Sequence, residues 1–177
     1  VPQLKDEFTK SLLFDSVSST NAALKSLDRS FKIQANPRKI NLFYVLDDLR
    51  ERIVEENGSF RVLATEMSFD LESINKEIEQ YPERFSPNVL MRPLYQETIL
   101  PNLSYTGGGG ELAYWLQLKS YFKASKIEFP ILMHRNSALV MMKEQLKDLE
   151  DLGLSTADLF LTNDALTAKV TKFHSQQ

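Results

Sequence analysis

The chain has 177 residues, of which 42% are hydrophobic and 25% charged, and its formal net charge is -3 at pH 7. This near-balanced charge, with Lys and Arg scattered along the chain, excludes the basic surface that is typical of nucleic-acid-binding proteins. The lack of cysteine excludes disulfides, thiolate nucleophiles and thiolate metal sites, and it favours a reducing, cytoplasmic environment.

Membrane segments and metal sites are not expected either. No apolar run approaches the ~20 residues that a membrane span requires, and the first residues lack the order of a signal peptide. The two histidines have no metal-binding spacing. Because the chain starts without Met and stops inside the helical pattern "LTAKVTKFHSQQ", we expect it to be a piece of a longer protein.

Residues 1–85 form a predicted region of helices and a β-hairpin. Apolar residues at helical spacing predict one helix within residues 1–14 and a second that begins at Ser19 or Thr20 and reaches Phe31.

Two alternatives remain open between residues 40 and 64. The apolar spacing fits a helix closed by Gly58, whereas Asn57-Gly58 between two β-rich runs fits a hairpin, which we favour. The next helix is expected to be capped by Ser68 and ended by Pro82.

Residues 86–153 form a predicted α/β core segment. Ser86-Pro87 is expected to start a helix, Pro93 to kink or restart it, and Pro101 to stop it. A short strand, "NLSYT", then leads through four glycines into a largely buried helix over residues 111–125. A buried strand in "FPILMHRNSALVM" follows, so the order of strand, helix and strand predicts a parallel α/β sheet.

The last part of the chain is expected to be helical. The helix in "MKEQLKDLEDLG" should end at Gly153, and Ser155 with Asp158 should cap a final helix. Residues 154–177 are therefore expected to be helical.

The glycine run Gly107 to Gly110 is the main candidate for chemistry. Glycines at a helix N-terminus expose backbone N–H groups to the positive end of the helix dipole, so an anion can approach closely. The run is neither the dinucleotide fingerprint, because Ala113 occupies its last position, nor a P-loop. A turn that merely lets the helix pack on its strand remains the alternative.

Three further groups of polar residues are candidates, each with a plainer alternative. Glu111 could bind an amine or act as a base, or it could be a helix-end charge. Arg135 and Asn136 follow a strand and could hold a carboxylate or amide, while the neighbouring His134 is expected to pack. Asn88, Arg92 and Gln96 recur every four residues and could form one binding face or a solvated one.

A resemblance to a known family rests on specific stretches. "RFSPNVLMRPLYQETILPNLSYTGGGGELAYWLQLKSYF", followed by "FPILMHRNSALVM" and preceded by "NPRKINLFY", resembles the bacillithiol biosynthesis cysteine-adding enzymes, between about Phe31 and Phe160. The resemblance implies a ligase that adds cysteine to glucosaminyl-malate in the cytoplasm. It also implies a Rossmann-like core similar to class I aminoacyl-tRNA synthetases, with helical insertions and a coiled-coil arm that forms a homodimer. The resemblance assigns residues 154–177 to the start of this helical arm.

The resemblance also selects site residues. Its polar motif falls on Asn88, Arg92 and Gln96, and its glycine loop, which usually has Pro where Gly109 stands here, ends in Glu111. The remaining matches are Gly107, Gly108, Gly110, Arg135, Asn136 and Ser137. In this interpretation the glycine amides hold an anionic group, and Glu111 orients them or meets the cysteine amine. A nucleotide such as ATP or ADP stays an open possibility.

The family's N-terminal motifs are absent and its arm is cut off at Gln177, so we expect an internal fragment that is inactive alone.

Two other functions remain alternatives. Leu146, Leu149 and Leu152 would suit a non-catalytic helical interaction domain, although the repeat is short for a coiled coil. A different synthetase-like nucleotide binder is the third interpretation.

Overall fold

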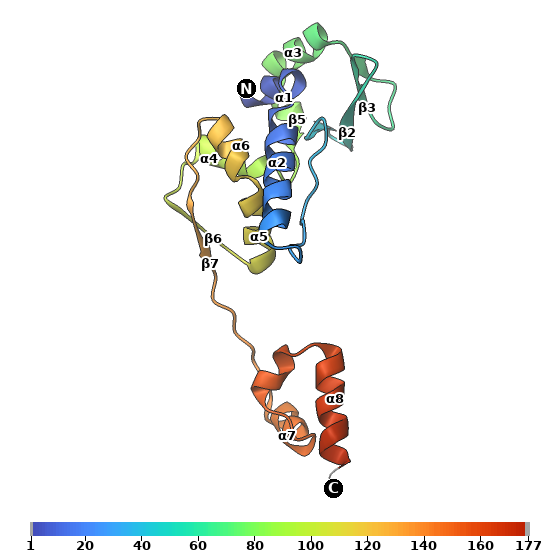
Figure 1. Ribbon diagram of the computed structural model, residues 1–177. Helices are drawn as coiled ribbons and strands as arrows, with labels where there is room; N and C mark the ends of the chain where they lie inside the picture. Colours follow the sequence, from blue (N-terminus) through green and yellow to red (C-terminus); the bar gives the residue numbers. More distant parts are fainter. Residues whose placement is uncertain (1, 176–177) are drawn as a thin grey trace. The chain divides into compact units, whose positions relative to one another are not determined.

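The computed structural model describes residues 2–175, which divide into two units between Arg135 and Asn136 (Figure 1). The first unit holds a five-stranded antiparallel sheet, a two-stranded parallel sheet and six α-helices, counted over the described residues. This mixed α/β architecture confirms the predicted fold class. The likeness to class I synthetases and the division at residues 85 and 153 stay predictions.

The chain begins with α1 (Pro2–Thr9) and α2 (Leu12–Leu27), and the predicted boundaries of both were wrong. Ser11 adopts a left-handed backbone conformation, with φ of 45°, and separates the two helices. Leu13 and Val17 are fully buried, so the first turn of α2 belongs to the core. Thr20 lies inside α2, where its hydroxyl donates to the Ser16 carbonyl at 3.0 Å instead of capping a helix.

The antiparallel sheet has the order β4-β3-β2-β1-β5. Its strands are β1 (Leu42–Leu46), β2 (Leu49–Glu56), β3 (Ser59–Val62), β4 (Ser68–Phe69) and β5 (Phe85–Pro87). The predicted hairpin is confirmed: Glu56 pairs with Ser59, and Asn57 and Gly58 have φ of 52° and 80°. Two positive φ angles make the type I′ turn that Asn-Gly favours, so the alternative helix was wrong.

Helices α1 and α3 (Leu71–Gln80) cover one face of this sheet. Phe8 of α1 packs edge-on against Phe60, with ring centroids 4.9 Å apart, and lies near Phe85. Ile74 and Ile78 of α3 are fully buried. The strands alternate buried and half-buried residues, as expected for a sheet with one covered face.

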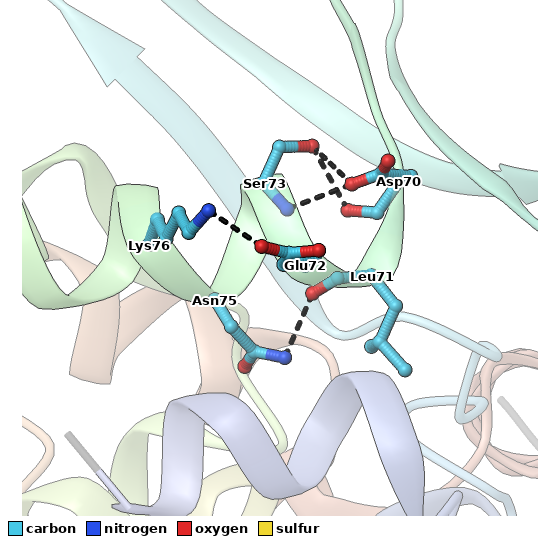
Figure 2. A network of polar contacts seen from close by, with 6 residues as sticks. All are labelled: Asp70, Leu71, Glu72, Ser73, Asn75 and Lys76. Carbon is cyan, nitrogen blue, oxygen red and sulfur yellow. Dashed lines mark hydrogen bonds and ion pairs between the residues drawn. The ribbon is translucent and has the colours of Figure 1, made fainter.

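The N-cap of α3 is Asp70, so the prediction that Ser68 caps it was wrong. Figure 2 shows the Asp70 carboxylate accepting from the Ser73 amide at 2.7 Å and from the Ser73 hydroxyl at 2.6 Å. Ser68 is instead paired with Arg61 between β4 and β3. The helix does end before Pro82, as predicted, and η1 (Pro82–Arg84) follows it.

Residues 86 and 87 form a strand and do not start a helix, which corrects the prediction for Ser86-Pro87. Pro87 pairs with Leu42 at the end of β5, an edge strand that tolerates the missing N–H. Helix α4 (Arg92–Ile99) begins later, with Pro93 in its first turn, and ends before Pro101.

The parallel pair confirms the predicted order of strand, helix and strand. β6 (Ser104–Gly107) and β7 (Ile131–His134) are joined through α5 (Gly109–Gln117) and α6 (Lys119–Ala124). The expected single helix over 111–125 is thus broken at Leu118. The prediction that β7 is buried was also wrong: Ile131 is 69% exposed and Met133 52% exposed, because the described residues provide no third strand or covering helix on that side.

The second unit consists of α7 (Lys143–Asp151), η2 (Thr156–Phe160) and α8 (Asn163–His174). Gly153 follows α7 with φ of 68°, as predicted. The Ser155 amide and hydroxyl donate to Asp158, but this cap opens η2, whereas α8 is capped by Thr162. Over residues 2–175, no helix has the length and apolarity needed to cross a bilayer.

Candidate anion site at the glycine loop

The structure brings the glycine loop and the residue after β7 together. Gly107 ends β6 opposite His134, and the Arg135 amide donates to the Gly107 carbonyl at 3.0 Å. Gly108 is the N-cap of α5, so its neighbours lie where a parallel strand meets a helix N-terminus. Ligands of α/β proteins commonly bind at the carboxyl ends of parallel strands.

At the first two glycines an added side chain would crowd other side chains of the chain. A Cβ on Gly107 would lie 2.9 Å from the Tyr105 ring, and a Cβ on Gly108 would lie 3.0 Å from Nη2 of Arg135. The Arg135 guanidinium therefore lies directly against the backbone of Gly108.

The last two glycines face open space. A Cβ on Gly109 would meet only His134 Nε2, at 3.8 Å, and one on Gly110 would meet no atom within 4 Å. Both residues are exposed. Their lack of side chains leaves room for a group from outside the described chain.

The backbone amides of this loop are partly occupied. The Gly108 amide donates to Glu111 Oε2 at 2.8 Å. Among residues 2–175, the amides of Gly109, Gly110 and Glu111 have no hydrogen-bond acceptor. Three unpaired N–H groups at the positive end of α5, beside the Arg135 guanidinium, form an electropositive cradle that suits a carboxylate or phosphate.

Glu111 closes the loop as a charged side chain. The hydrogen bond from the Gly108 amide lowers the pKa of Glu111, and so do the Tyr105 hydroxyl, which donates to Oε1 at 3.3 Å, and the Arg135 charge. Both carboxylate oxygens are thus engaged, which favours an orienting role over that of a general base.

Tyr105 is a supporting residue that the sequence did not single out. Its ring stacks on Trp115 with centroids 4.3 Å apart and an interplanar angle of 28°, which ties β6 to α5 beneath the loop. Trp115 is buried as expected. The sequence signal for Tyr105 was its place directly before "TGGGG", in a strand that leads into a helix rich in aromatic residues.

Asn88 serves the chain's own structure. Its Oδ1 accepts from the amides of Leu90 and Met91 at 3.0 and 3.1 Å, and its Nδ2 donates to Asn41 at 2.8 Å. These contacts hold the turn between β5 and α4. Both polar groups of the Asn88 side chain thus already have partners within the chain. Its role in substrate binding stays a prediction.

Arg92 and Gln96 lie on α4, and no hydrogen bond or ion pair within residues 2–175 joins them to the glycine loop. Arg92 is exposed and Gln96 is half-buried. Gln96 contacts Glu97 at 3.4 Å, and buried Glu97 in turn accepts from the Asn102 amide at 2.8 Å, just before β6. Asn136 is the first residue of the second unit, so its place in the site also stays a prediction.

The sequence analysis missed a buried polar network behind Asn88. Glu7, on α1, is 4% exposed, and its Oε1 accepts from the Asn41 amide and side chain at 2.7 and 2.8 Å. Burial raises the pKa of Glu7 to about 7, although the hydrogen bonds from Asn41 lower it. The signal was a carboxylate at helical spacing between the buried residues Leu4 and Phe8.

Comparison with known proteins identifies the family. Residues 1–136 match the family model described as bacillithiol biosynthesis BshC, N-terminal Rossmann-like domain. Proteins named "Putative cysteine ligase BshC" are similar over nearly the whole chain: that of Flavobacterium johnsoniae is 48% identical over 98% of this chain, and that of Bacillus pumilus 34% identical over 98%. The chain spans 33% and 31% of the length of these two relatives. The similarity thus begins well before Phe31, where the sequence analysis placed it, and the chain belongs to the BshC family of bacillithiol biosynthesis.

Proposed function

We propose that this chain supplies part of the substrate site of a cysteine ligase that joins cysteine to glucosaminyl-malate in the last step of bacillithiol biosynthesis. The relatives are named as cysteine ligases, and the family model carries the name of the pathway. The observation that carries the proposal is the electropositive cradle: the unpaired amides of Gly109, Gly110 and Glu111 beside the Arg135 guanidinium.

In this proposal each residue has a distinct role. The cradle binds a carboxylate of the malate group or, if a nucleotide takes part, a phosphate, because both anions accept several N–H donors at once. Glu111 fixes the Gly108 amide and thereby the direction of the three free amides. Arg92, Gln96 and Asn136 add polar contacts once the rest of the enzyme is in place.

We also propose that the chain works as a piece of a longer cytoplasmic enzyme and is inactive alone. Support comes from the share of the relatives that it spans and from the exposed apolar residues of β7, since strands of parallel sheets are normally covered on both faces. Dimerisation through a helical arm that includes the second unit belongs to the same proposal.

The test uses two glycine-to-alanine variants in the full-length protein. Gly108→Ala should push the Arg135 guanidinium aside by a few tenths of an ångström and lower the rate of product formation severalfold, by weakening one charge-assisted contact, while the fold is retained. Gly110→Ala, which meets no atom of the chain, should leave stability unchanged or slightly higher and reduce activity only through contact with the bound ligand.

Mass spectrometry of the product and thermal unfolding of each variant would provide the two measurements. Unchanged turnover in both variants, with normal folding, would refute a role for the loop in binding. A thermal shift with glucosaminyl-malate that Arg135→Met abolishes would support it independently.

A further inference from the structure

A cavity lies away from the glycine loop, between α1 and α6. It has a volume of about 400 Å³, within the usual range for small-molecule sites. Its polar lining comes from both helices and the residues after α6 and includes Asp6, Glu7, Lys10, Tyr121, Ser125 and Lys126.

Glu7 presents an unused acceptor at this cavity. Its Oε1 is held by Asn41, but Oε2 has no hydrogen-bond partner among residues 2–175, although the side chain is 4% exposed. Solvent can still reach Oε2, since it is not among the fully buried side-chain atoms that lack a partner. Because Oε2 has no donor among the described residues but can be reached from the cavity, a ligand or water can supply the missing hydrogen bond.

Tyr121 provides a second unused group. It is 3% exposed and lines the cavity, and no side-chain hydrogen bond within the described residues involves its hydroxyl, which is not sealed from solvent. Burial raises the pKa of Tyr121, and the charges of Glu7 and Asp6 raise it further, so the hydroxyl keeps its proton and lies within the field of Glu7.

The two lysines of the cavity differ. Lys10 is paired with Asp6 at 2.8 Å, whereas Lys126 forms no ion pair with any described residue. The cavity therefore combines a free carboxylate oxygen and a phenol in its buried part with a free ammonium group at its exposed part.

We propose that this cavity binds a small zwitterion, such as a free α-amino acid. The ligand's ammonium group donates to Glu7 Oε2 and the Tyr121 hydroxyl oxygen, and its carboxylate pairs with Lys126. The proposal uses no residue of the glycine loop and does not depend on the proposed ligase reaction.

The charge state of Glu7 makes binding depend on pH. Burial raises the pKa of Glu7 to about 7, and an ammonium ligand favours the charged form. The other charged side chains that line the cavity are Asp6, Lys10 and Lys126, and Tyr121 keeps its proton because burial raises its pKa. Affinity should therefore rise between pH 6 and pH 8.

The experiment is calorimetric titration of the full-length protein with L-alanine, which has no thiol and so does not enter cysteine ligation. Ethylamine and propionate serve as probes that carry only one of the two charges. We expect L-alanine to bind more tightly than ethylamine, and propionate not to bind. Absence of binding by L-alanine at millimolar concentration would overturn the proposal.

The most informative variant is Glu7→Gln, because its Oε1 can still accept from Asn41 while the cavity-facing oxygen becomes a donor. It should weaken L-alanine binding about tenfold or more and remove the pH dependence. Tyr121→Phe and Lys126→Met should each weaken binding severalfold, and they test the site if Glu7→Gln fails to fold. Lys25→Met, which removes a charge from α2 outside the cavity, is the control; equal affinity in all these variants would contradict the proposal.

Discussion

The two sheets of the first unit differ in how far the chain completes them. The antiparallel sheet is covered by α1 and α3, and its inward residues Ile53, Phe60 and Val62 are at most 5% exposed. The parallel pair of β6 and β7 leaves Ile131 and Met133 mostly exposed. The glycine loop lies on the less covered sheet, so the candidate site is built where the first unit buries the least apolar surface.

The largest expected effect concerns the core of the antiparallel sheet. Phe60→Ala should lower the free energy of unfolding by about 3–5 kcal/mol, because it removes a buried ring packed on Phe8. Met133→Ala, on exposed β7, should change it by less than about 0.5 kcal/mol in this chain. Urea denaturation monitored by circular dichroism measures both, and similar losses in the two variants would erase the proposed contrast.

The next effect is a pH dependence of the antiparallel region. The pKa of Glu7 is raised from 4.5 to about 7, so the folded state binds more protons than the unfolded state between these values. Stability should therefore fall as pH rises from about 5 to 7, by an amount on the order of 3 kcal/mol. Glu7→Gln should flatten this fall, measured by urea denaturation at several pH values; an unchanged slope would mean that Glu7 titrates normally.

The smallest effect separates Asn88 from its sequence neighbour in the polar motif. Asn88→Ala should cost about 1–3 kcal/mol, because the amides of Leu90 and Met91 and the Asn41 side chain lose their partner. Arg92→Ala, on an exposed position, should stay within about 0.5 kcal/mol but raise KM in the full-length enzyme. If Asn88→Ala left stability intact and raised KM instead, Asn88 would belong to the substrate site.

Local chemistry explains which parts of the fold were predictable. Asn57-Gly58 specifies its turn within two residues, and Pro82 and Pro101 end helices because proline lacks a backbone donor. The strand, glycine loop and helix at Gly107 to Glu111 were likewise visible as a continuous pattern.

The errors arose where several local solutions compete. By residue type, any of Ser19, Ser68 and Ser86 could cap a helix. Instead, Ser19 lies inside α2, whereas Ser68 and Ser86 are paired with residues of neighbouring strands. The contact between Asn41 and Asn88 joins residues far apart in sequence, so no periodicity could show it. The meeting of Arg135 with Gly108 followed from the expected parallel strands, whereas the tie from Tyr105 to Glu111 needed coordinates.

The hydrogen bond between Gly108 and Glu111 has a consequence for ligand size. The Glu111 carboxylate already accepts from the Gly108 amide, so an incoming anion would find free donors only from Gly109 onward. A compact group such as a carboxylate or a terminal phosphate can reach that position end-on, whereas a long diphosphate lying across the helix mouth would compete with Glu111 for the same N–H. If the loop binds an anion as proposed, it therefore favours ligands that present their charge at a tip.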